Sequence, residues 1–156
     1  MNIGLLVYSV SGHSLSVAKR LKARLEATGH TATMVRLETV GGSRLEAERT
    51  PLKALPELDA YDGLVVCSPV RGGALPPPVC AMMEQLSGLE HKRVACLLTH
   101  AFRPTWGANQ TLAQMRELCQ QRGMSLCGAC ETSWHLLGRE KNIARAVECV
   151  LAALAG

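Results

Sequence analysis

The chain has few aromatic residues, with one Phe, two Trp and two Tyr in 156 residues. Its apolar mass is Ala, Leu and Val, small side chains that suit the interfaces between helices and a sheet. It also lacks an apolar run long enough to span a bilayer, and its first residues lack the basic start of a secretion signal. We therefore expect one α/β domain over residues 1–156, located in the cytoplasm and without a membrane partner.

The sequence also lacks a block of Lys and Arg, although its formal net charge is +4. The basic residues are spread along the chain, and no basic cluster is interleaved with aromatic side chains. Binding of nucleic acid usually depends on a concentrated basic surface. We therefore expect no nucleic-acid partner.

The seven cysteines are an odd number, and most lie in apolar or helical patterns. This distribution predicts reduced, mostly buried thiols. Cys127 and Cys130 form a C-x-x-C pair, but they fall in a predicted strand, where residues three apart point to opposite faces. No second C-x-x-C completes a zinc site. No metal ligand is assigned, and a dithiol or zinc role for this pair stays a minor alternative.

Strand-like and helix-like apolar patterns alternate along the whole chain. The predicted strands cover residues 3–8, 31–37, 63–67, 94–99 and 124–132, and the predicted helices cover 15–27, 78–86, 109–121 and 139–154. Because the strands lack polar alternation, they indicate a parallel sheet that is covered on both faces. The expected fold is a doubly wound α/β sandwich with five parallel strands. The sequence leaves open what the polar connection at residues 40–60 does.

Ligands of doubly wound sheets bind beyond the carboxyl ends of the strands. Three unusual loops, at residues 9–14, 68–77 and 100–108, should share that edge. The first loop is rich in hydroxyls and leads into a helix, whose amides and dipole attract anions. Gly12 in this loop permits a close backbone approach. The pattern therefore predicts a phosphate site that contains neither Lys nor Arg.

Several phosphate-binding families of this topology are excluded by missing residues. The sequence lacks G-x-G-x-x-G, the dinucleotide fingerprint, and G-x-x-x-x-G-K-[ST], the P-loop. The first loop lacks the Cys and Arg of a phosphotyrosine phosphatase. The acidic residues of a receiver domain are also missing after the first and third predicted strands.

The remaining pattern resembles the flavodoxin-like FMN-binding family. That family's first loop runs S/T-x-T/S-G-N/H-T/S, which the six residues from Ser9 to Ser14 fit. The sequence S-P-V-R-G-G at 68–73 is similar to the family's second loop, and residues 100–107 would form the third. The resemblance implies non-covalent FMN and the following cofactor-binding residues: Ser9, Ser11, Gly12, His13, Ser14, Pro69, Val70, Arg71, Gly72, Gly73, His100, Phe102, Trp106 and Gly107.

Two features depart from this family. The second loop has no aromatic residue to stack on the flavin, so Phe102 and Trp106 are the candidates. The net charge is positive, whereas electron-carrying flavodoxins are strongly acidic, and Arg71 lies in a flavin loop. A cation there would stabilise the anionic reduced flavin and favour two-electron chemistry. His100 could act as a proton donor or a substrate contact, or it could satisfy a backbone group, and no catalytic residue is assigned.

Three functions follow from this resemblance. The first is an electron-transfer flavodoxin that carries electrons between redox partner proteins. The second is an FMN-dependent oxidoreductase that takes hydride from a nicotinamide cofactor and reduces a quinone or a similar small acceptor. The third is a binding module that has lost its flavin. The terminal helix would pack equally well on its own sheet or on a second subunit, so a homodimer stays open.

Overall fold

The computed structural model describes residues 1–40, 52–100, 107–134 and 137–156. Strands and helices alternate along these residues, and their bounds lie within two residues of those predicted. The strands are β1 (Asn2–Val7), β2 (Thr31–Arg36), β3 (Gly63–Pro69), β4 (Arg93–His100) and β5 (Ser125–Ser133). The helices are α1 (His13–Ala27), α3 (Pro77–Gln85), α4 (Ala108–Gln121) and α5 (Arg139–Ala155). None of these helices is long and apolar enough to cross a membrane.

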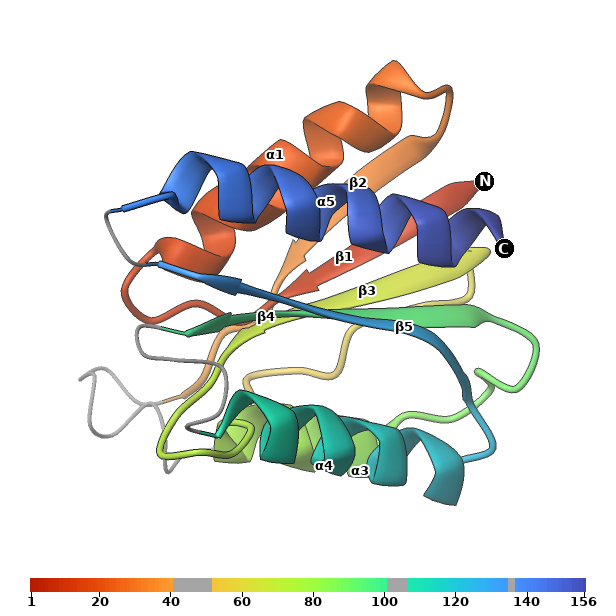
Figure 1. Cartoon of the computed structure of the whole chain (residues 1–156). Coiled ribbons are helices and arrows are strands. Elements are labelled where there is room, and N and C mark those ends of the chain that lie inside the picture. Colours follow the sequence, from red (N-terminus) through yellow and green to blue (C-terminus); the bar gives the residue numbers. More distant parts are fainter. Residues whose placement is uncertain (41–51, 101–106, 135–136) are drawn as a thin grey trace.

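The strands form one sheet in the order β2-β1-β3-β4-β5, and every neighbouring pair is parallel. Figure 1 shows α1 and α5 on one face of the sheet and α3 and α4 on the other. Covering both faces explains why β3 reads as an unbroken apolar run, since its first six residues are buried. The doubly wound prediction is confirmed.

The core divides into two layers because successive side chains of a strand point to opposite faces. In β1, Ile3, Leu5 and Val7 pack toward the layer that holds α1 and α5. Leu6 and Tyr8 pack in the layer that holds α3 and α4. The buried residues of the two layers are mostly aliphatic, Met and Cys, in line with the scarcity of aromatic residues.

Strand β5 contains a β-bulge, and the bulge changes which side chains share a face. Its pairing with β4 shifts between Val94 and Ala95, so that Cys127 is an extra residue without a partner in the register. Cys127 and Cys130 consequently both pack against the α1 and α5 layer. The expectation that these two residues point to opposite faces is wrong, because it assumed an unbroken alternation.

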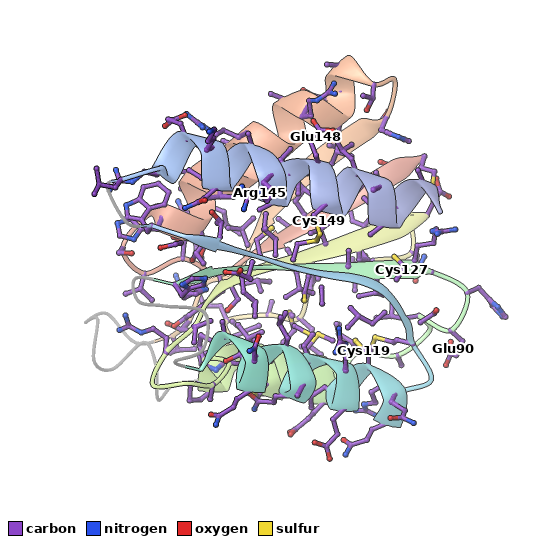
Figure 2. The ribbon with its side chains drawn as sticks, viewed as in Figure 1. Glu90, Cys119, Cys127, Arg145, Glu148 and Cys149 are labelled. Atoms are coloured by element: carbon purple, nitrogen blue, oxygen red, sulfur yellow. A yellow bond between two sulfur atoms is a disulfide. The ribbon has the colours of Figure 1, made fainter. Side chains whose placement is uncertain are left out.

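A disulfide between Cys130 and Cys149 joins β5 to α5, with 6.1 Å between the two Cα atoms. Figure 2 shows Cys149 on α5 with its sulfur toward β5. The prediction of reduced thiols is therefore wrong for these two residues. Cys130 is already bonded to Cys149, so the C-x-x-C motif is not the pair that bonds. The free cysteines are Cys67, Cys80, Cys96, Cys119 and Cys127.

Candidate functional site

The carboxyl ends of β1, β3 and β4 lie at the same edge of the sheet, together with the loops after β1 and β3, because the strands are parallel (Figure 1). A cavity of about 70 Å³ opens among them. It brings together six of the predicted cofactor-binding residues and adds two others. The predicted residues are Ser11, His13, Pro69, Val70, Arg71 and His100, and the additions are Thr99 and Trp134.

The first loop turns into α1 around Gly12, which has a left-handed backbone with φ of 88°. Ser9 Oγ accepts hydrogen bonds from the amides of Gly12, at 3.1 Å, and Leu15, at 3.3 Å. A hydroxyl has two acceptor positions and one proton, so this arrangement leaves the Ser9 proton available for donation. Nothing lies within 4 Å of a Cβ placed on Gly12. The backbone here is open to an approaching anion.

Ser14 and Ser11 lie in opposite environments within the same loop. Ser14 is buried, and its Oγ forms a 2.7 Å hydrogen bond with Thr99 Oγ1, which links the start of α1 to β4. Ser11 is exposed and lines the cavity. The Ser14 hydroxyl therefore orients the loop, whereas Ser11 faces the space in which a ligand would bind.

Trp134 follows β5 and reaches the first loop, a contact that the sequence did not reveal. Its ring stacks on that of His13 with 4.3 Å between the centroids and 16° between the planes. The guanidinium of Arg139 lies 4.6 Å from the Trp134 ring, and its Nη2 donates to the Trp134 carbonyl at 3.1 Å. The chain has few aromatic residues, and one of them, Trp134, directly follows the fifth strand. This position was the sequence signal that could have indicated a role at the site.

The second loop is a tight turn closed between Arg71 and Ala74. The Arg71 amide donates to the Ala74 carbonyl at 2.9 Å, and the Ala74 amide donates back at 3.2 Å. Gly72 and Gly73 between them both have positive φ. A Cβ on Gly107, at the end of the third loop, would lie 2.4 Å from the Gly73 Cα atom. Gly73 and Gly107 thus lie in contact, and a side chain at Gly107 would clash with the Gly73 backbone.

His100 ends β4 and forms a hydrogen bond from Nε2 to the carboxylate of Glu131 on the neighbouring strand. His100 is buried, whereas the Glu131 side chain is partly exposed. The carboxylate fixes how the imidazole is oriented beside the cavity. Phe102 and Trp106 lie outside the described residues, so their contact with a flavin ring stays a prediction.

The donor set fits the phosphate of a flavin mononucleotide. The cavity lining offers the Ser11 hydroxyl, two imidazoles and the Arg71 guanidinium, and it holds no carboxylate among the described residues. The amino terminus of α1 adds amides and a positive dipole end. An anion would meet donors on several sides at this edge.

The sequence of residues 1–135 matches the family described as NADPH-dependent FMN reductase. A stretch of 91 residues is 32% identical to an NAD(P)H dehydrogenase (quinone) from Cupriavidus metallidurans. This stretch covers 54% of the chain and 46% of that protein. The chain thus spans about half the length of this curated relative.

Solved structures of flavodoxins share the fold over the whole chain. Flavodoxin 1 from Bacillus cereus superposes with a TM-score of 0.68 and 16% identity, covering 99% of this chain and 97% of its own. A variant of the flavodoxin from Pseudomonas aeruginosa gives 0.63 and 21% identity, with both chains fully covered. These likenesses confirm the flavodoxin-like fold. With the match over residues 1–135, they identify this chain as an FMN-binding member of the NADPH-dependent FMN reductase family.

Proposed function

We propose that this protein is an FMN-dependent reductase that takes hydride from a nicotinamide cofactor and passes electrons to a quinone or a similar small acceptor. The observation that carries the proposal is the family match over residues 1–135. The name of the Cupriavidus metallidurans relative, which includes both NAD(P)H and quinone, supports it.

The side chains around the cavity suit two-electron chemistry. FMN, when bound, supplies the group that accepts and gives up hydride. Ser11, His13 and the amino terminus of α1 would hold its phosphate, and the turn at Arg71–Ala74 would border its ring. Arg71 lines the same cavity and would place a positive charge beside a flavin ring bound there. Such a charge stabilises the anionic, fully reduced flavin.

The size of this stabilisation follows from Coulomb attraction. A unit charge about 7 Å away, at an effective dielectric constant of about 20, contributes roughly 2.4 kcal/mol, or on the order of 100 mV for one electron. We therefore expect Arg71→Ala to lower the potential of the second electron by several tens of millivolts. Arg122→Ala is the matched control, because Arg122 is exposed and caps the carboxyl end of α4, whereas Gly107 at the other end of this helix contacts the second loop.

A second candidate function, electron transfer between proteins, is supported by the likeness to flavodoxins. The structure aligns with flavodoxin 1 over 97% of that chain. A carrier of single electrons needs only an exposed flavin edge and a docking surface. This alternative predicts slow reduction by NAD(P)H and two separate one-electron steps.

The experiment that decides between these functions is anaerobic mixing of the FMN-loaded protein with NADPH and, separately, NADH, followed by absorbance. A reductase bleaches the flavin in one two-electron phase and reoxidises when benzoquinone is added. An electron carrier reacts slowly with both nucleotides and is reduced in two steps by dithionite. A protein whose flavin ignores both nucleotides refutes the reductase proposal. An unchanged potential in Arg71→Ala refutes the placement of Arg71 against the flavin.

A further inference from the structure

A second cavity, here called the β5 notch, lies beside the site just described. It has a volume of about 230 Å³ and lies between the carboxyl end of β5 and the first turns of α5. Among the strands that the structure describes, β5 pairs with β4 alone and is an edge strand of the sheet. The lining side chains are all polar or charged: His100, Glu131, Thr132, Ser133, Asn142 and Arg145.

The guanidinium of the notch belongs to Arg145, an exposed residue of α5. The two glutamates of α5 pair with helix α1, Glu140 with Arg20 at 2.5 Å and Glu148 with Arg24 at 2.7 Å. Arg145 has no ion pair or hydrogen bond among the residues that the structure describes. Figure 2 shows it along α5, one turn before Cys149. Its charge is therefore available to a ligand.

Glu131, the carboxylate of the notch, contacts the Nε2 atom of His100 on β4, and it forms no ion pair with Arg145 in the described part of the chain. Arg145 and Asn142 are three residues apart on α5, so they project toward the same side of the helix. The notch thus presents a guanidinium and an amide next to each other, a combination that suits an anionic oxygen group.

Thr132 gives an independent sign of a missing ligand. Its side chain is 1% exposed, and its Oγ1 has no hydrogen-bond partner within the described part of the chain. A buried hydroxyl without a partner costs free energy, and native proteins rarely leave one unless it serves a site. Thr132 lines the notch, so an acceptor bound there would take its proton.

His100 connects the notch with the flavin site, because it lines both cavities. A molecule with its reactive ring against the flavin and an anionic group some distance away would therefore reach the notch past His100. Nicotinamide dinucleotides have this form. We infer that the β5 notch binds a phosphate group of the nicotinamide dinucleotide, through Arg145, Asn142 and Thr132. This inference rests on the proposed function and adds where the hydride donor is held.

The chemistry of the lining favours this ligand over the electron acceptor. A quinone is neutral and flat, and it gains little from a guanidinium. A phosphate accepts hydrogen bonds from Arg, Asn and hydroxyl donors at once. The volume of about 230 Å³ suits one phosphate with its sugar rather than a whole dinucleotide. The remainder of the molecule would extend toward the flavin cavity.

The test compares Arg145→Ala with wild type, both loaded with FMN, and uses Lys141→Ala as the matched control. Lys141 is an exposed cation of the same helix that borders a different cavity, with Gly138, Arg139 and Glu140. Steady-state oxidation of NADPH and NADH gives KM and kcat, and calorimetric titration of the oxidised protein with NADP⁺ and NAD⁺ gives Kd without turnover.

We expect Arg145→Ala to raise KM and Kd on the order of ten- to a hundredfold, as for a lost charged hydrogen bond, while kcat stays within about twofold. Arg145→Lys should restore part of the affinity, and Lys141→Ala should behave as wild type. A loss confined to NADPH and NADP⁺ identifies the 2′-phosphate as the bound group. An equal loss for both nucleotide pairs identifies the pyrophosphate.

Two results overturn the inference by itself: Arg145→Ala with wild-type KM and Kd, or Lys141→Ala with the same loss as Arg145→Ala. Inorganic phosphate that competes with neither nucleotide for binding to wild type also counts against the inference. A wild-type protein that neither oxidises NAD(P)H nor binds NADP⁺ or NAD⁺ overturns the proposed function, and the inference then fails with it.

Discussion

The disulfide between Cys130 and Cys149 makes a prediction about stability that can be worked from the chain. The two residues are 19 apart in sequence, and they close a loop from β5 to α5. In the chain-entropy treatment, such a loop removes about 11 cal/mol/K from the unfolded state, or about 3 kcal/mol at 25 °C. For a domain of this size, that corresponds to a fall in Tm of about 6–12 °C when the bond is absent.

The perturbation is Cys149→Ser, and the assay is thermal unfolding followed by circular dichroism with and without dithiothreitol. Cys149 is exposed, so the substitution removes the bond while it disturbs little packing. The Tm of wild type should fall by the predicted amount when reductant is added. The Tm of Cys149→Ser should be lower from the start and should not change with reductant. Cys127→Ser keeps the disulfide and should respond to reductant as wild type does.

Two results would refute this reasoning. If Cys149→Ser unfolds at the temperature of the oxidised wild type, then the bond does not constrain the unfolded chain as calculated. If Cys127→Ser abolishes the response to reductant, then Cys127 rather than Cys149 is the partner of Cys130. The second result would also mean that the C-x-x-C pair is a dithiol after all.

Two further predictions concern the loops and the core. Gly107→Ala places a Cβ 2.4 Å from the Gly73 Cα atom and should weaken FMN binding by about 1–3 kcal/mol in a flavin fluorescence titration. Gly123→Ala, which is also left-handed but lacks that clash, should leave FMN affinity unchanged. Burial raises the pKa of the Cys67 and Cys96 thiols to about 12, so the stability that these protonated thiols give should be complete below pH 9 and lost between pH 9 and 12. Denaturant unfolding at pH 8 and pH 10 measures the loss of unfolding free energy over this range. The loss should be smaller in Cys96→Ala than in wild type, and an equal loss in both would contradict the prediction.

Much of the fold was predictable because local patterns and the fold agree. The apolar run of β3 is unbroken since both faces of the strand are covered, and this alone indicated a parallel sheet. Helix α1 ends near Gly29, and α4 ends just before Gly123, where positive φ stops the helix as the sequence indicated. Strand bounds were less certain, because hydrogen bonds to neighbouring strands decide them. β3 extends two residues further, to Pro69, because it pairs with β4 there.

The site was predictable where it depends on one loop and less so where two elements meet. The turn at Arg71 and the helix start at Gly12 are local structures, and the glycines in the sequence indicated both of them. The stack of His13 on Trp134 joins residues far apart in the chain, and so do the hydrogen bonds from Ser14 to Thr99 and between His100 and Glu131. No single stretch of sequence contains the information for such pairs.

By itself, the sequence determined the alternation of strands and helices, the covered parallel sheet and the loop residues that face its carboxyl edge. These properties come from periodicity and from turn residues, which act over a few neighbouring positions. The tertiary structure decided the disulfide, the shared face of Cys127 and Cys130, and the gathering of Thr132 and Arg145 in one notch. Each of these depends on the register of β5 against β4 and on where α5 packs. One extra residue in a strand reverses every side chain beyond it, and only the assembled sheet fixes where that residue lies.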